Sequence, residues 1–70
     1  MSQIIQFPSP PKPLVRVDWP MGRRYRTAVA LPTEHGTVVV ELLDASGAVR
    51  RTSVHQDADS ASKWIEEVEP

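Results

Sequence analysis

The 70-residue chain contains no cysteine, only four aromatic side chains and no long apolar run. Without cysteine the chain can form no disulfide, use no thiolate nucleophile and build no cysteine-based zinc site. No segment approaches the roughly 18 consecutive apolar residues that a membrane-spanning helix needs. The first 13 residues also lack the basic start and the apolar core of a secretory signal. These absences predict a cytoplasmic protein with one small domain.

The sequence also lacks the basic excess of a dedicated nucleic-acid binder, because its net charge is −1. The charge is nevertheless unevenly distributed, with +3 on residues 1–35 and −4 on residues 36–70. An asymmetry of this kind is typical of a chain that presents a surface to a partner.

Proline is concentrated near the amino end, where PSPPKP (residues 8–13) holds four of the seven prolines. Proline fixes φ and has no N–H to donate, so residues 1–13 are predicted to form an extended, polyproline-like arm. Ile4, Ile5 and Phe7 give this arm an apolar tip. The sequence leaves open whether the arm is ordered, and whether its tip docks on the domain, residues 14–70, or on a partner.

The three glycines each close a similar quartet: WPMG at 19–22, TEHG at 33–36 and DASG at 44–47. Glycine at the fourth place supplies the left-handed conformation that follows a type I turn. Four β-rich runs flank these turns, at residues 14–19, 24–31, 37–43 and 48–55. Strand-like runs joined by short turns predict an antiparallel meander.

The last segment changes from the period of a strand to that of a helix. Trp64 widens an apolar stripe formed by Ala58, Ala61, Ile65 and Val68. Either Asp57 or Asp59 suits the N-cap. The predicted fold class is therefore α+β, a four-stranded antiparallel β-meander with one C-terminal α-helix; the alternative is an SH3-like small barrel plus a helix.

Symmetric pairing about TEHG and DASG assigns the side chains to two faces of the predicted sheet. The helix-covered face would carry Tyr25, Thr27, Val29, Leu31, Val38, Val40, Leu42 and Val49. The opposite face would carry Arg26, Ala28, Ala30, Val39, Glu41, Leu43, Arg50 and Thr52, with Glu41 across from Arg50. A glycine bulge after either turn would shift this register by one residue.

The first strand adds apolar side chains to the second face, because the simplest register places Val15, Val17 and Trp19 beside Ala28 and Ala30. The resulting patch is larger than a solitary soluble protein normally exposes, so a barrel closure, the arm or another chain should cover it. Tryptophan and arginine are the commonest anchors of protein interfaces. The predicted partner-binding residues are Trp19, Val15, Val17, Arg16, Arg23, Arg24, Arg26 and Arg50.

These features predict a small non-enzymatic module that binds another protein or a second copy of itself. Its size and style suit an adaptor or inhibitor encoded by a bacterium or a phage. The alternative partner is a nucleic acid, held by the arginine cluster at residues 16–26, where RRYR interleaves a tyrosine with three arginines.

Candidate catalytic and metal-binding residues are few. His35 and His55 are 20 residues apart, and without cysteine they make a poor metal site. Ser53, His55 and Asp57 alternate in one extended stretch, whereas a nucleophilic triad needs groups that converge from separate elements. We therefore expect no catalytic residues, no metal and no cofactor.

Residues 22–54 resemble Tudor-like and other SH3-like small barrels in the rhythm of their strands. The matching positions are Gly22, Tyr25, Arg26, Val29, Val38, Val40, Asp44 and Gly47. The resemblance implies a small curled sheet used for binding. Tudor-type methyl-ligand binders use an aromatic cage, for which this sequence offers only Tyr25 and Trp19.

Overall fold

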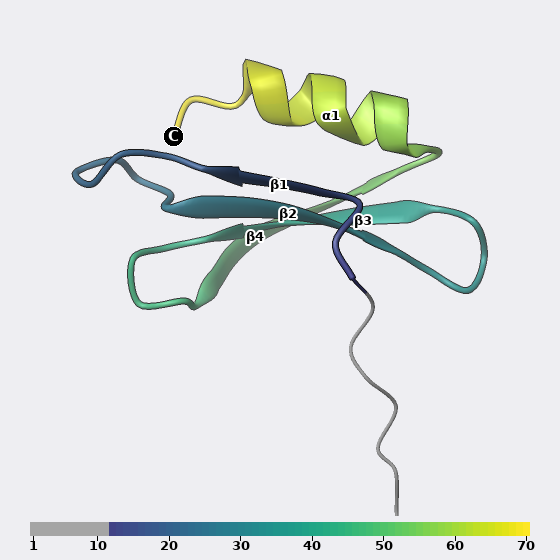
Figure 1. The fold of residues 1–70 in the computed structure, drawn as a ribbon, viewed down its shortest axis with the longest axis horizontal. Helices are drawn as coiled ribbons and strands as arrows, with labels where there is room; N and C mark the ends of the chain where they lie inside the picture. The colour runs from purple at the N-terminus through teal and green to yellow at the C-terminus, as the bar shows by residue number, and fades with distance from the viewer. Residues whose placement is uncertain (1–11) are drawn as a thin grey trace, which may run out of the picture.

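The computed structural model describes residues 12–70, so the first 11 residues of the predicted arm lie outside the described part of the chain. The elements are β1 (Val15–Asp18), β2 (Thr27–Pro32), β3 (Val38–Leu43), β4 (Val49–His55) and α1 (Ala58–Glu67). The strands pair antiparallel in chain order, and α1 lies across one side of the sheet (Figure 1). This confirms the α+β prediction. The sheet is open, with β1 and β4 as its edges, so the observed architecture is the meander rather than the barrel.

Glycine closes the β2–β3 and β3–β4 hairpins in the left-handed conformation, at φ 82° for Gly36 and φ 87° for Gly47. In the first hairpin the Thr33 N–H donates to the Thr37 carbonyl at 3.0 Å, and in the second the Asp44 N–H donates to the Ala48 carbonyl at 3.0 Å. Each loop therefore holds three residues, which is the type I turn followed by a left-handed residue. The symmetric pairing assumed from the sequence has a two-residue loop instead.

The extra loop residue shifts the register of β2 against β3 by one position, which exchanges the two faces of β2. Ala30 lies opposite Val40, and Ala28 lies opposite Leu42. Cross-strand neighbours share a face, and a shift of one residue moves every side chain of a strand to the other face. The predicted faces are therefore wrong for β2: Ala28 and Ala30 lie beneath the helix, whereas Thr27, Val29 and Leu31 lie on the other side.

The three-residue DASG loop shifts the predicted pairing of β3 with β4 by one residue, and a β-bulge beside Leu42 and Leu43 shifts it by one more. Glu41 lies opposite Thr52, so the predicted pairing of Glu41 with Arg50 is wrong. Arg50 instead donates from Nε to Asp44 Oδ2 at 2.6 Å. The Ser46 hydroxyl and then the Arg50 guanidinium hold the pKa of Asp44 well below its usual range. Val49, predicted to lie under the helix, is opposite Leu43 and 47% exposed.

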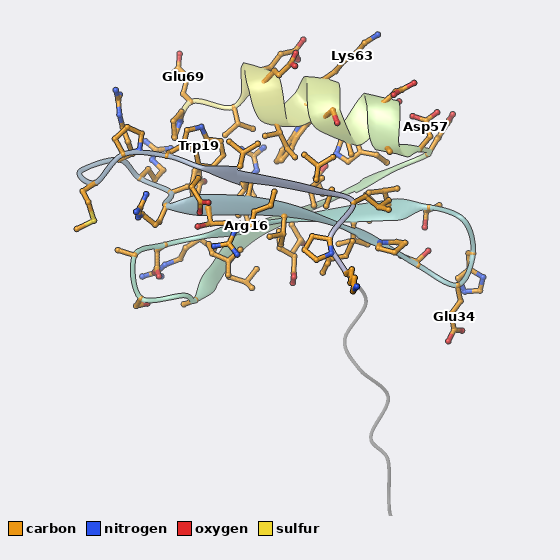
Figure 2. All side chains as sticks on the ribbon, in the orientation of Figure 1. Arg16, Trp19, Glu34, Asp57, Lys63 and Glu69 are labelled. Atoms are coloured by element: carbon orange, nitrogen blue, oxygen red, sulfur yellow. The ribbon has the colours of Figure 1, made fainter. Side chains whose placement is uncertain are left out.

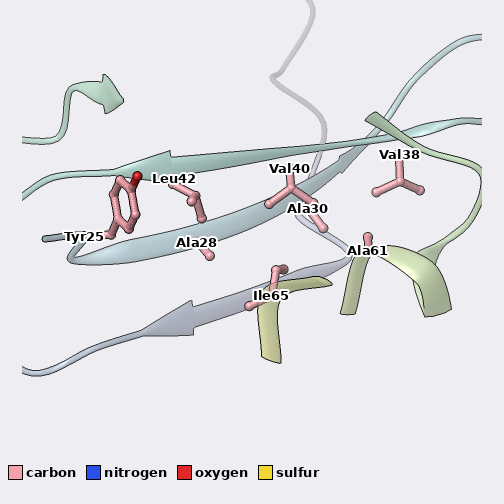
Figure 3. Packing of buried hydrophobic residues seen from close by; sticks show 8 residues of the cluster. All are labelled: Tyr25, Ala28, Ala30, Val38, Val40, Leu42, Ala61 and Ile65. Carbon is pink, nitrogen blue, oxygen red and sulfur yellow. The ribbon is translucent and has the colours of Figure 1, made fainter. Parts of the chain in front are cut away.

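The core lies between the sheet and α1 (Figure 3). The small side chains of Ala28, Ala30 and Ala61 are fully buried, and they allow the helix to lie close to the sheet. A ten-residue helix is marginal alone in water, so this contact is what stabilises it. The buried hydrophobic residues are Tyr25, Ala28, Ala30, Val38, Val40, Leu42, Ala61 and Ile65.

Asp57 is the N-cap of α1, as one of the two sequence alternatives proposed. Its carboxylate accepts a hydrogen bond from the Ser60 backbone N–H at 2.8 Å, which satisfies one of the orphan donors of the first turn. That backbone bond, followed by the Ser60 hydroxyl, lowers the pKa of Asp57. Within residues 12–70, no helix has both the length and the apolar composition needed to span a membrane.

Candidate functional site

The side of the sheet turned away from α1 is not covered by any element within the described part of the chain (Figure 1). We call this surface the open face. Strand alternation and the observed register assign it three residues from each strand region. They are Leu14, Arg16, Asp18, Thr27, Val29, Leu31, Val39, Glu41, Leu43, Val49, Thr52 and Val54.

An apolar row crosses the open face at the end of the sheet where β1 begins. Leu31 lies opposite Val39, which lies opposite Val54. Leu14 directly precedes β1 and joins the row by alternation; its backbone N–H donates to the Ala30 carbonyl at 2.8 Å. Leu14 is 52% exposed and Val54 is 67% exposed. Within residues 12–70, no element covers this apolar row, Leu14–Leu31–Val39–Val54.

The next row of the open face carries opposite charges on different strands. Register places Arg16, Val29, Glu41 and Thr52 in line across the sheet. Arg16 Nε lies 3.4 Å from Asp18 Oδ2, and both side chains are more than half exposed, so this pair contributes little stability. Glu41 forms no ion pair with any residue of the described part. The row therefore offers a cation and an anion to a partner.

The third row is held more firmly by the chain itself. The Thr27 hydroxyl donates to Asp18 Oδ1 at 2.8 Å, and this bond is the main cause of the lowered pKa of Asp18. Leu43 lies opposite Thr27 and Val49 on its two neighbouring strands. This end of the open face is therefore mixed in polarity, in contrast to the apolar row.

Three of the predicted partner-binding residues lie on the other side of the sheet. Val15 and Val17 share a face with Ala28 and Ala30, as predicted, but this face lies beneath α1 because the loop between β2 and β3 exchanges the two faces of β2. Both valines and Trp19 are half-buried and pack against the core. Figure 2 shows Trp19 on the helix side of the sheet and Arg16 on the opposite side. The predicted face of these three residues is wrong, and their role in binding stays a prediction.

The predicted arginines divide among several environments. Arg16 is on the open face, and Arg50 is exposed and bonded to Asp44. Arg26 is half-buried and donates from its guanidinium to the Trp19 carbonyl, which closes the connection between β1 and β2. Arg23 and Arg24 are exposed in that connection. Two of the four arginines of the 16–26 cluster are thus engaged within the chain.

A shallow hollow of about 320 Å³ lies on the helix side, beside the connection between β1 and β2. The guanidinium carbon of Arg51 lies 5.3 Å from the centre of the Trp64 ring, a cation–π contact. Glutamates and arginines both line this hollow, so its charge is mixed and favours neither an anionic nor a cationic ligand. Its lining residues are Arg24, Tyr25, Arg51, Trp64, Glu67, Val68 and Glu69.

The residues considered for chemistry do not converge. His35 is exposed in its turn, and the ring of His55 lies 5.4 Å from that of Trp64, with Nε2 unpaired among residues 12–70. Asp57 caps the helix, and no hydrogen bond joins it to Ser53 or His55 in this part of the chain. The same residues contain no group of three His, Cys, Asp or Glu side chains placed to hold a metal ion.

Sequence reasoning missed the apolar row because it assigned Leu31 to the covered face and left Leu14 and Val54 out of the site. The available signal was TEHG itself, since a glycine at the fourth place fits a three-residue loop as well as a two-residue one.

Comparison of the chain with protein-family models, curated proteins and solved structures finds no match in any of the three.

Proposed function

We propose that the chain is a non-enzymatic protein-interaction module whose contact surface is the open face. The observation that supports this proposal is the apolar row on an uncovered sheet, beside a row that carries Arg16 and Glu41. Monomeric proteins rarely expose a contiguous apolar patch of this kind without using it. An adaptor or an inhibitor would act through such a surface.

The pattern of the open face matches the anatomy of protein interfaces. Half-buried Leu31 and Val39 are central, on the two inner strands, and exposed Leu14 and Val54 extend the row to both edges. Charged side chains lie to one side, where they would set orientation and exclude wrong partners. The rigid hydrogen-bonded sheet holds all these groups in place, so binding would require little ordering of the backbone.

Site-specific photo-cross-linking in cells of the native source tests this function. A photoreactive amino acid at Val54, which is 67% exposed, should capture a protein, because Val54 lies in the proposed interface. The matched control places the same amino acid at Glu66, an exposed position of α1. Leu31→Lys should abolish the Val54 product by adding a charge to the apolar row.

Equal labelling from Val54 and Glu66, or a Val54 product that persists in Leu31→Lys, would contradict the proposal. A Val54 product that contains RNA or DNA rather than protein would favour the nucleic-acid alternative instead. The mass of the product separates a heterologous partner from a second copy of the chain.

A further inference from the structure

The open face carries an apolar row beside a row with Arg16 on one strand and Glu41 on another. We infer that two copies of the chain pack their open faces together, related by a two-fold axis parallel to the strands. The product is a four-layer dimer with two sheets inside and one helix on each outer side. This inference rests on the proposed function and names the partner as a second copy.

A two-fold axis parallel to the strands places each row of the open face opposite the same row of the second copy. It places β1 over the partner's β4 and β2 over the partner's β3, because the sheet has the order β1-β2-β3-β4. Leu31 then faces the partner's Val39, and Leu14 faces the partner's Val54. All four members of the apolar row are covered by the same row of the second copy, as in the inner layer of a β-sandwich.

The charged row fits the same axis. Arg16 is on the edge strand β1, and Glu41 is on β3, which is next to the opposite edge. The rotation places Arg16 above the partner's Thr52, one strand away from the partner's Glu41. Facing sheets pack about 10 Å apart, and an arginine and a glutamate together can span that gap. Symmetry provides two such ion pairs, and each satisfies a Glu41 that has no cation within residues 12–70 of its own copy.

The other in-plane axis, perpendicular to the strands, is disfavoured by the same residues. When it passes through the charged row, it places Arg16 on the partner's Arg16 and Glu41 on the partner's Glu41. It also places the apolar row over the row that contains Asp18 and Thr27. Like charges directly opposed across an interface are strongly unfavourable. Between these two arrangements, charge and hydrophobicity therefore favour the axis parallel to the strands.

The area of the open face sets the expected strength of the dimer. Four strands about 4.8 Å apart and about six residues long give a face of roughly 20 Å by 20 Å. Two such faces bury on the order of 1,000 Å² in total, which is at the small end for specific interfaces. We therefore expect a dissociation constant in the micromolar range.

Sedimentation equilibrium from low micromolar to near-millimolar protein tests the dimer. The unmodified chain should shift from monomer to dimer across this range. Arg16→Glu and Glu41→Arg should each weaken dimerisation about tenfold or more, because each opposes like charges across the interface. The double variant, Arg16→Glu with Glu41→Arg, should restore most of the loss, since it exchanges the two charges of each pair. Lys63→Glu on the exposed side of α1 is the control and should leave the dissociation constant unchanged.

Circular dichroism of each variant shows whether the fold is kept, and all these positions except half-buried Glu41 are exposed. An unmodified chain that stays monomeric at every concentration would overturn the inference. A double variant no better than the single ones would overturn the proposed axis. A monomer whose Val54 position still captures a different protein in cells would remove the dimer while leaving the proposed function in place.

Discussion

Replacing Ala30 by lysine is expected to unfold the domain, whereas the same change at the adjacent Leu31 should leave it folded. Ala30 is fully buried beneath α1, and Leu31 is half-buried on the open face. A lysine at position 30 would add volume between sheet and helix and would bury a charge with no partner, at a cost of several kcal/mol. A domain this small has a total stability on the order of 5 kcal/mol, so the loss should be complete.

Thermal unfolding followed by circular dichroism measures this contrast. Ala30→Lys should show no cooperative transition, and Leu31→Lys should melt within a few degrees of the unmodified chain. Hydrophobicity alone suggests the reverse order of the two effects, because leucine is the larger apolar residue. If Ala30→Lys folds and Leu31→Lys does not, the result would support the symmetric register with its two-residue loop and would contradict the structure.

Replacing Leu42 by alanine is expected to remove most of the stability of the domain. Leu42 and Val40 are the largest side chains that are fully buried, and Leu42 lies opposite Ala28 at the centre of the sheet. Truncation of a buried leucine costs about 2–5 kcal/mol, because apolar contacts are lost and a cavity remains. For a domain of this length, each kcal/mol lowers the melting temperature by roughly 4–8 °C.

Leu43→Ala is the matched control, because Leu43 is the next residue of β3 and lies half-buried on the open face. We expect Leu43→Ala to lower the free energy of unfolding by less than about 1 kcal/mol, as is usual for positions outside the core. Chemical denaturation of both variants gives the two values. Equal losses would show that both faces of β3 are covered in the isolated chain.

The order of elements could be predicted because local chemistry determines it. TEHG and DASG each become a turn with glycine at positive φ, and the helical stripe of Ala61 and Ile65 becomes the buried side of α1. WPMG instead lies in a longer connection, which the hydrogen bond from the Trp19 N–H to the Arg26 carbonyl closes. Val15 and Val17 also share a face with Ala28 and Ala30, as the simplest register of the first strand predicted. These features depend on neighbours in sequence or on simple alternation, which a single sequence contains.

The faces could not be predicted because they depend on the number of residues in a loop. One additional residue between β2 and β3 exchanges the two faces of β2, and β1 follows because it pairs with β2. The bulge beside Leu42 and Leu43 likewise frees Arg50 to bond Asp44. Turn quartets such as TEHG are compatible with either loop length, so packing of the small alanines beneath the helix decides between them.

Both the predicted register and the observed register, by contrast, leave an apolar surface on the side of the sheet opposite the helix. The β3 sequence VVVELL places apolar side chains on both faces, and within residues 12–70 the one helix covers only one of them. The error concerned which residues form the surplus: the sequence pointed to Val15, Val17 and Trp19, and the structure exposes Leu14 and Val54 instead. Val39, on the inner strand β3, belongs to the uncovered face in both accounts.

Methyl NMR with a soluble paramagnetic gadolinium chelate tests most directly whether the open face is a contact surface. In dilute protein, the chelate should strongly relax the methyl groups of Leu31, Val39 and Val54 while Val40 and Leu42 stay shielded. At the highest workable concentration, the first three should become protected as the second copy covers them. Methyl groups of Leu31 and Val39 that are as shielded as those of Val40 in the dilute monomer would contradict the account.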